Sequence, residues 1–469
     1  MKLKVVVNSR APPSHATGAA VKPPALVDIH ALSPDGVAIG RDTRGRERTV
    51  RGAPLGATVK VIGRPDTSIL VEVVTPAPDA VLPRCPQSGS CGGCTLQDVP
   101  LGRQRAAKHE ALAALLGPLG GTDHGIEAPD DDGYGYRNRV ELTFGERGWL
   151  TAEAQARGDS LAGRFLGFHP PGRFDRVVDA PTCALISPAM NDVLRRARAD
   201  LLPSPWSFWE PREHVGFWRH LSLREGDEGV LATLYTSPGD ATQEAWLRER
   251  APTWGAAGVV WCETEAAADV ASGATREVLH GVERLHTRLG DARFHIGPAS
   301  FFQVNHAGAE RLVARVGEAL GAGAGGGTLL DLYCGAGAIS LALGRRFRRI
   351  IGVDANAAAI ADARANAADN GIDAEFHAGL CEAVVPGLTL PERPAIVVDP
   401  PRAGLHPSAL RFVATLDAPV LVYVACRPSS LLRDARGLML AGWRCTDRWA
   451  VDLFPQTGHV EVVARFARD

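Results

Sequence analysis

Residues 328–340 read TLLDLYCGAGAIS, and this segment sets the architecture of the C-terminal part of the 469-residue chain. Its first five residues form an apolar strand, and Gly335 and Gly337 follow where a helix is expected to open. A turn that lacks side chains lets a ligand approach the backbone closely. The segment therefore predicts a strand, a tight turn and a helix, with a ligand at the turn.

Three further apolar segments, RIIGVD, AIVVD and VLVYVA, alternate with Ala- and Arg-rich helical segments such as NAAAIADARANAADN. Strand–helix alternation of this kind predicts a parallel, doubly wound Rossmann-like α/β sheet. Ligands in such sheets bind outside the carboxyl ends of the strands. Asp354, Asp399 and Cys426 end three of these strands and become candidate site residues.

Asp354 lies 19 residues after Gly335, where an acidic side chain can accept both ribose hydroxyls of an adenosine-containing cofactor. Ser340 replaces the third glycine of a dinucleotide-binding fingerprint. The segment therefore favours S-adenosylmethionine over NAD.

The composition indicates a cytoplasmic globular protein of two to four domains. Hydrophobic residues make up 45% of the chain, and no uninterrupted apolar run reaches the roughly 18 residues of a membrane span. The opening MKLKVVVNSR has too short an apolar segment for a secretory signal. Nine cysteines are too sparse for a disulfide framework, so clustered cysteines indicate metal ligands.

The N-terminal region predicts a flexible tail over residues 1–23 and a small β-barrel of oligonucleotide-binding type over residues 24–83. Short apolar segments alternate there with Gly, Pro and Asp turns, although an unrelated β-module fits the same spacing. Residues 1–60 contain ten Lys or Arg and four Asp or Glu, a net charge of +6. This excess indicates contact with nucleic acid, and a solvated charged face is the alternative.

Cys85, Cys91 and Cys94 are spaced C-x5-C-x2-C in a turn-rich segment, followed by an expected helix over residues 103–116. Three such thiolates can hold three corners of a metal site, and Cys183 is the chosen fourth ligand. Zinc would accept the same four sulfurs as readily as an iron–sulfur cluster. Core positions are expected for the cysteines in apolar or Ala-rich surroundings: Cys262, Cys334, Cys381 and Cys445.

Cys426 ends an apolar strand, and Pro428 can open a helix through Leu431 and Leu432. A thiol at such a junction is either a core residue or a nucleophile near helix amides. Asp399 follows another strand and precedes two prolines, which hold it rigidly. Glu461 lies among apolar residues, so its carboxylate is either functional or paired with an arginine.

Six segments in order resemble motifs of the RNA (uracil-5-)-methyltransferases, in the form that carries an N-terminal TRAM domain and an iron–sulfur cluster. The resemblance runs from about Ala25 to the C-terminus. The segments are PRCPQSGSCGGCTLQ, SFFQVNHAGAE, DLYCGAGAISLAL, VVDPPRAGL, VACRPSSLLRD and FPQTGHVEVVARF.

This resemblance implies that Cys426 is the nucleophile, that Glu461 removes the C5 proton and that Asp399 holds the uracil. S-adenosylmethionine would bind at Gln303, Tyr333, Gly335, Gly337, Asp354 and Asp399. A four-iron four-sulfur cluster would bind at Cys85, Cys91, Cys94 and Cys183.

The implied organisation is a central domain with the cluster over residues 84–300 and a methyltransferase domain over residues 301–469. Helix 100–118 would pack with the methyltransferase domain. The implied activity is methylation of C5 of a uridine in 23S ribosomal RNA by a monomer, with transfer RNA as the alternative substrate and cytosine C5 methylation as a rarer one.

Two functions of other classes account for fewer of these motifs. A cluster-containing NAD-dependent oxidoreductase has no use for Cys426 together with Glu461, and a silent RNA-binding protein would have lost one of them. Four positions depart from the family pattern. They are Arg427, where Asn or Asp is usual, Asp354 in place of Glu, and Ala338 and Leu380 in place of residues that are often polar.

Overall fold

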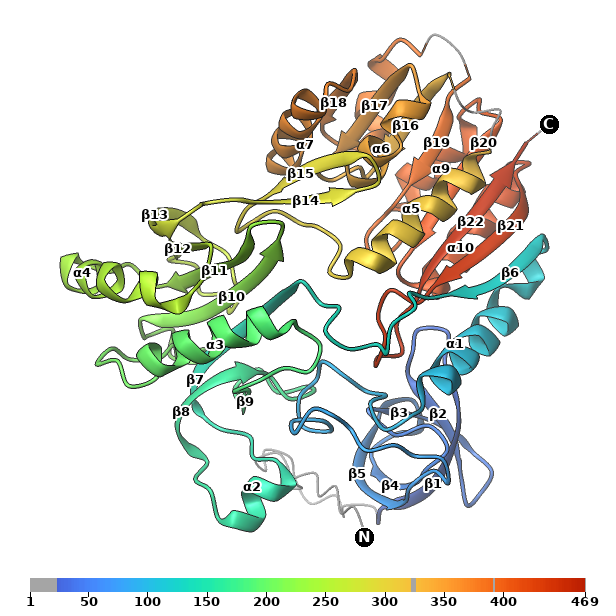
Figure 1. The fold of residues 1–469 in the computed structure, drawn as a ribbon. Helices are drawn as coiled ribbons and strands as arrows, with labels where there is room; N and C mark the ends of the chain where they lie inside the picture. The colour runs from blue at the N-terminus through green and yellow to red at the C-terminus, as the bar shows by residue number, and fades with distance from the viewer. Residues whose placement is uncertain (1–22, 322–325, 391–392, 469) are drawn as a thin grey trace.

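The computed structural model describes residues 23–321, 326–390 and 393–468 (Figure 1). The expected N-terminal tail lies outside the described residues except for Pro23. The described chain forms a closed barrel, a seven-stranded sheet, a two-stranded sheet and an eight-stranded sheet. None of its described helices is long and apolar enough to cross a membrane.

The N-terminal barrel contains five strands in the order β1-β2-β3-β5-β4 and confirms the barrel expected from the sequence. Alternating small apolar residues face its interior, among them Val27, Val50 and Val59, because the side-chain period of a strand is two. The strands are β1 (Ala25–Leu32), β2 (Ala38–Asp42), β3 (Glu47–Arg51), β4 (Thr58–Ile62) and β5 (Ser68–Thr75).

The C-terminal sheet has the strand order β18-β17-β16-β19-β20-β22-β21-β6. Its first five strands are parallel, which confirms the doubly wound sheet. β22 runs antiparallel to both β20 and β21. The strands are β16 (Thr328–Leu332), β17 (Arg349–Asp354), β18 (Ala374–Ala378), β19 (Ala395–Val398), β20 (Val420–Ala425), β21 (Arg444–Val451), β22 (Glu461–Ala467) and β6 (Thr122–Glu127).

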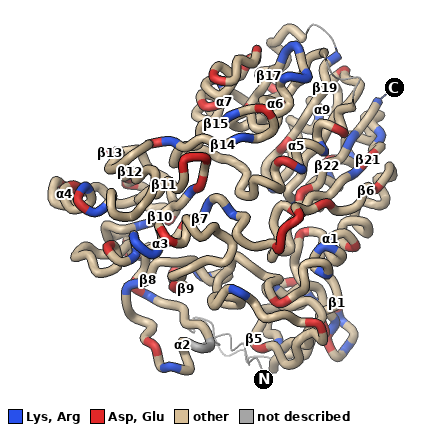
Figure 2. Tube along the Cα trace, viewed as in Figure 1, with Lys and Arg blue, Asp and Glu red and all other residues tan. Residues whose placement is uncertain are grey.

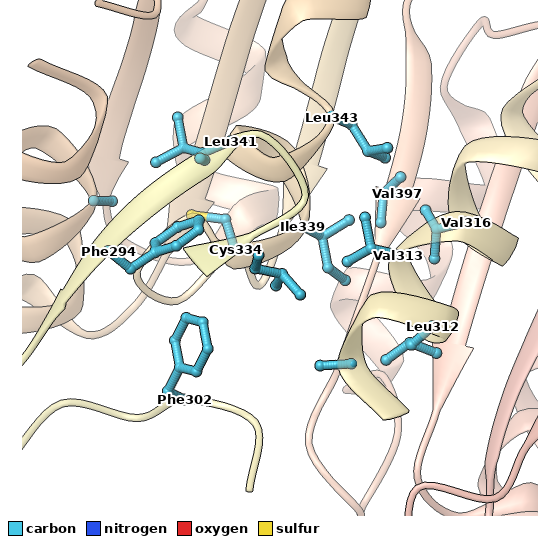
Figure 3. Packing of buried hydrophobic residues seen from close by; sticks show 14 of the residues in the cluster. Phe294, Phe302, Leu312, Val313, Val316, Cys334, Ile339, Leu341, Leu343 and Val397 are labelled. Atoms are coloured by element: carbon cyan, nitrogen blue, oxygen red, sulfur yellow. The ribbon is translucent and has the colours of Figure 1, made fainter. Parts of the chain in front are cut away.

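Helices cover both faces of this sheet. One face packs on α5 (His306–Leu320), α6 (Ala338–Ala342) and α7 (Ala357–Asn370), and the other on α8 (Cys381–Val384), α9 (Pro407–Thr415), α10 (Pro428–Leu440) and α1 (Leu101–Leu116). Figure 3 shows Val313 and Val316 of α5 against Val397 of β19. Because both faces are covered, the central strands are mainly apolar, with Asp331 of β16 as a buried exception.

The central seven-stranded sheet has the order β13-β12-β11-β10-β7-β8-β9. Trp218, Trp254 and Trp261 are fully buried between it and its helices. Its elements are β7 (Arg139–Arg147), β8 (Ala162–Phe168), β9 (Val178–Asp179), β10 (Trp218–Gly226), β11 (Gly229–Thr236), β12 (Gly258–Glu263), β13 (Ala274–Gly281), α2 (Ala152–Arg157), α3 (Pro188–Leu201) and α4 (Ala241–Arg250). The separate hairpin β14 (Leu285–Leu289) and β15 (Ala292–Ile296) packs into the core below α6.

Two early segments join the late sheet. β6 pairs in parallel with β21 at the sheet edge, although its residues lie in the range expected for the central domain. Helix α1 packs against β1 of the barrel and against α10 and β6. The chain between the barrel and the central sheet is therefore built into the C-terminal part of the molecule (Figure 1).

Candidate active site

Cys426 lies in the two-residue link between β20 and α10. Ala425, the last residue of β20, pairs with Val462 of antiparallel β22. Continuing this register by one residue brings Cys426 opposite Glu461, the first residue of β22. Pro428 opens α10, as the sequence predicted, because its fixed φ suits the first helical position.

Asp399 follows β19, whose Val398 pairs with Tyr423 of β20. Its backbone N–H donates to the carbonyl of Leu332 at 3.2 Å, which holds it at the carboxyl end of the sheet. Asp399, Cys426 and Glu461 were named as catalytic from the sequence. The topology brings all three to the same end of the sheet, on the adjacent strands β19, β20 and β22.

Burial raises the pKa of all three acidic groups. The pKa of Cys426 rises to about 11, with a further contribution from Glu461 and Asp399, and Arg402 opposes the rise. The pKa of Asp399 rises to about 7, and that of the fully enclosed Glu461 lies well above its usual value. These groups hold protons readily, so any of them that becomes ionised is a strong base.

The loop before Glu461 is held by helix α1. The ammonium of Lys108 donates to Asp452 Oδ1 at 2.6 Å and to the carbonyl of Phe454 at 3.2 Å, and Lys108 and Asp452 are both buried. The Gln104 side chain donates to Gln456 Oε1 at 2.9 Å and accepts from the Gln456 amide at 3.0 Å.

The sequence analysis did not identify the four side chains that hold this loop, which are Gln104, Lys108, Asp452 and Gln456. A carboxylate within the apolar run WAVDLF was the one available signal for Asp452. Nothing local marks Lys108, because its partner lies 344 residues away.

The glycine-containing turn is shaped as the sequence predicted. Tyr333 adopts φ 64°, which is uncommon for a residue with a side chain, and its amide donates to the carbonyl of Val353 at 2.8 Å. Gly335 has φ 54°, and a Cβ there would meet no atom within 4 Å. The turn thus leaves open space directly above its backbone.

Asp354 is fixed beside this turn. Its two carboxylate oxygens accept from the amides of Gly335 at 3.0 Å and Asn356 at 2.7 Å. Each oxygen keeps a second lone pair for a hydroxyl donor.

Asp331 lies beneath the turn in β16, in a segment that the sequence marked as a strand end without giving this residue a role. It is buried, and the hydroxyl and amide of Ser340 approach its carboxylate without forming a hydrogen bond of normal geometry. Burial raises its pKa to about 7, and neighbouring Ser340 partly offsets this. Because a buried, unpaired carboxylate is unfavourable, the region suits a ligand with donor or cationic groups.

Gln303, which was named for cofactor contact, and Leu380, which departs from the family pattern, are placed less decisively. Gln303 is half-buried in the segment before α5, where its carbonyl accepts from Asn138 Nδ2 at 3.0 Å. Leu380 precedes α8 and is 59% exposed, so this departure from the family pattern presents an apolar side chain at the surface.

Cys85, Cys91, Cys94 and Cys183 line one cavity of about 370 Å³. All four are free and half-buried. Burial is the main cause that raises the pKa of Cys91 and of Cys94 to about 12. Asn191 fixes Cys183 by accepting from its amide at 2.9 Å and donating to its carbonyl at 3.0 Å.

Four thiols line this cavity, and zinc and an iron–sulfur cluster both accept this donor set. Among the described residues, no three His, Cys, Asp or Glu side chains are placed to hold a metal ion. Zinc–sulfur bonds of about 2.3 Å would draw the sulfurs tightly together. The remaining cysteines, Cys262, Cys334, Cys381 and Cys445, are buried as expected.

The model of the tRNA (uracil-5-)-methyltransferase family matches residues 281–378 and 389–468. An uncharacterized RNA methyltransferase of Chlorobaculum tepidum is 36% identical over 85% of each chain. A tRNA (uracil(54)-C(5))-methyltransferase of Pyrococcus abyssi is 31% identical over 84% of this chain and 88% of its own. The chain belongs to the RNA (uracil-C5) methyltransferase family. This membership confirms the resemblance and the enzyme class.

A solved structure of this family extends the match to the fold. The crystal structure of the Pyrococcus abyssi tRNA (uracil-54, C5)-methyltransferase in complex with S-adenosyl-L-homocysteine has a TM-score of 0.74 and 26% identity. The match covers 94% of this chain and 99% of that one. It supports a methyltransferase fold with an N-terminal barrel, and the relatives named for a substrate here are tRNA enzymes.

Proposed function

We propose that this enzyme transfers a methyl group from S-adenosylmethionine to carbon 5 of a uridine in RNA through a covalent adduct with Cys426. The observation that carries the proposal is the position of Cys426 opposite Glu461 and beside Asp399, at the carboxyl end of the sheet that bears the glycine-containing turn. Transfer RNA is the first substrate to test because the relatives named above act on it. The 23S ribosomal RNA expected from the sequence is the second.

S-adenosylmethionine would bind above the turn formed by Tyr333, Gly335 and Gly337. The open space above Gly335 admits it, and the free lone pairs of Asp354 suit its ribose hydroxyls. The buried Asp331 carboxyl beneath the turn can pair with polar groups of the cofactor. Gln303 and Asp399 would complete this surface. When bound, S-adenosylmethionine supplies the electrophilic methyl group.

The uracil ring needs a nucleophile because its carbon 5 is unreactive. After giving up its proton to solvent, the Cys426 sulfur would form a bond to carbon 6, and the electron pair displaced from the ring double bond would give an enolate with a nucleophilic carbon 5. Carbon 5 would then take the methyl group as the bond between that methyl and the sulfonium sulfur breaks. Asp399, whose pKa of about 7 allows it to remain protonated, can donate a hydrogen bond to the ring as charge develops.

The product forms when carbon 5 loses its proton. Glu461, enclosed and strongly basic once ionised, would accept this proton as the bond between sulfur and carbon 6 breaks. The uracil ring must be accessible on both faces. A uridine in folded RNA would therefore be flipped out of its base stack.

The barrel, residues 24–83, would contact RNA phosphates. Figure 2 shows Lys and Arg interspersed with Asp and Glu around it. Arg46 and Arg48 pair with Asp42, so the exposed Arg41, Arg44 and Arg51 are better placed for phosphates. Four of the ten basic residues counted in the sequence lie in residues 1–22, outside the described residues. We also propose a central domain over residues 84–300 and a methyltransferase domain over residues 301–469.

The four cysteines of the cavity would hold a four-iron four-sulfur cluster. We expect anaerobically purified protein to be brown and to contain about four iron and four sulfide per chain. Cys85→Ser, Cys91→Ser, Cys94→Ser and Cys183→Ser should each lose the colour, whereas Cys262→Ser should keep it. Stoichiometric zinc without iron would contradict the assignment.

The substrate is tested by incubating the enzyme with methyl-labelled S-adenosylmethionine and either unmodified transfer RNA or 23S ribosomal RNA. We expect label in 5-methyluridine after digestion to nucleosides. Label in 5-methylcytidine would overturn the proposed reaction. Label confined to one RNA would settle which substrate this enzyme prefers.

A further inference from the structure

The turn between β1 and β2 of the barrel has a defined shape. Its sequence is Ser33-Pro34-Asp35-Gly36, in which Pro suits the second position and Gly36 adopts φ 81°. The Gly36 amide donates to the Ser33 carbonyl at 2.8 Å, and the Val37 amide donates to Ser33 Oγ at 2.9 Å. The turn therefore projects Asp35 from a rigid backbone.

This turn lies against the loop that precedes Glu461. A Cβ on Gly36 would come within 2.3 Å of the Gly458 carbonyl oxygen, and a Cβ on Gly458 would come within 2.1 Å of the Gly36 oxygen. The two backbones touch so closely that neither position has space for a side chain.

Asp35 also contacts the first turn of helix α10, directly after Cys426. Its Oδ2 accepts from Ser429 Oγ at 2.8 Å, and its Oδ1 accepts from the Ser429 amide at 3.3 Å. Arg427 Nε donates to Asp35 Oδ2 at 3.1 Å.

Helix α10 lacks a cap of its own. Arg427 occupies its N-cap position and provides no side-chain hydrogen bond to the exposed amides of the first turn. A carboxylate or amide oxygen at the N-cap normally accepts this bond. A negative charge there also interacts favourably with the positive end of the helix dipole. Asp35 supplies both from another part of the chain.

We infer that Asp35 is a positioning residue for methyl transfer, acting as the N-terminal cap of α10 from the barrel and thereby fixing the nucleophile Cys426. The inference rests on the proposed role of Cys426. Because Cys426 is separated from α10 by Arg427 alone, fraying of the first helical turn displaces its sulfur. A displacement of about 1 Å can slow a reaction by about 10²-fold.

The test compares Asp35→Ala with wild type in single-turnover methyl transfer at saturating S-adenosylmethionine and RNA. We expect the rate to fall about tenfold, the scale of losing a helix cap next to the reacting group, with RNA affinity little changed. Glu47→Ala is the matched control because it removes an exposed acid from β3 of the same barrel. It should keep the wild-type rate.

Two further variants isolate capping from charge and from folding. Asp35→Asn keeps a capping oxygen and should keep most of the rate. Arg427→Asn gives α10 its own cap, so adding Asp35→Ala to it should produce no further loss. This last comparison holds even if Asp35→Ala alone does not fold, because both of its members carry the new cap.

The role of Asp35 is overturned if Asp35→Ala transfers methyl at the wild-type rate, or if its only defect is weaker RNA binding. It is also overturned if Asp35→Ala slows the Arg427→Asn enzyme tenfold. A Cys426→Ala variant is run in parallel. Activity in that variant would overturn the proposed nucleophile, whereas a wild-type rate for Asp35→Ala in an enzyme that needs Cys426 overturns the role of Asp35 alone.

Discussion

Cys426→Ala is expected to abolish methyl transfer, whereas Glu461→Gln is expected to transfer one methyl group and then stop. Without the sulfur, carbon 5 never becomes nucleophilic, so the rate should fall by several orders of magnitude. Addition and methylation need no base at carbon 5. The Glu461→Gln enzyme should therefore reach the methylated adduct and fail to eliminate the thiolate.

A denaturing gel detects this adduct as a slow band that contains protein, RNA and methyl label. The band should be absent from the Cys426→Ala, Glu461→Gln double variant. Cys445→Ala is the control, because it removes a buried thiol at the start of β21, away from the proposed site, and should leave turnover intact. Near wild-type turnover by Glu461→Gln would show that another group is the base, with Asp399 the next candidate.

Lys108→Ala is expected to destabilise the protein by about 3–5 kcal/mol, because it leaves a buried carboxylate without its main partner. Asp452 is fully enclosed, and its other cation, Arg105, lies at 3.4 Å. The loss should appear as a lower urea midpoint for the C-terminal sheet. Activity should also fall at temperatures where the protein remains folded, because this pair anchors the loop before Glu461.

The control for Lys108→Ala is Lys60→Ala, which breaks a partly exposed pair with Glu72 at 2.8 Å in the barrel. Exposed pairs contribute at most about 1 kcal/mol, so its midpoint should hardly move. Replacing both members, in Lys108→Met with Asp452→Leu, should recover much of the lost stability because no charge is then left buried. Equal midpoints for Lys108→Ala and wild type would show that the pair is not coupled to folding.

The residues predicted as catalytic from the sequence all lie at the carboxyl end of the parallel strands. Their positions could be predicted because the end of a strand is visible in a short segment of sequence. Their roles remain predictions that the variants above test. The membership of the family is established, whereas the expectation of 23S ribosomal RNA now competes with transfer RNA, on which the named relatives act. Substrate choice depends on surfaces that short motifs do not describe.

The sequence by itself determined the elements whose patterns are local. The barrel strands alternate in burial with a period of two, β19 and β20 are continuous apolar runs, and β16 and β17 are mainly apolar. The turn at Gly335 follows from residues that are neighbours in the chain. Such elements can be predicted because hydrophobic period and backbone freedom are properties of short segments.

Only the tertiary structure decided which distant groups meet. The Lys108–Asp452 pair, the cap that Asp35 provides to α10, and the pairing of β6 with β21 join residues more than 300 positions apart. No local pattern encodes them, since an acid or an amine forms the same local structure with or without its partner. Burial at the contact between packed elements makes each pairing necessary, because a charge or a helix end left without a partner there would be unfavourable.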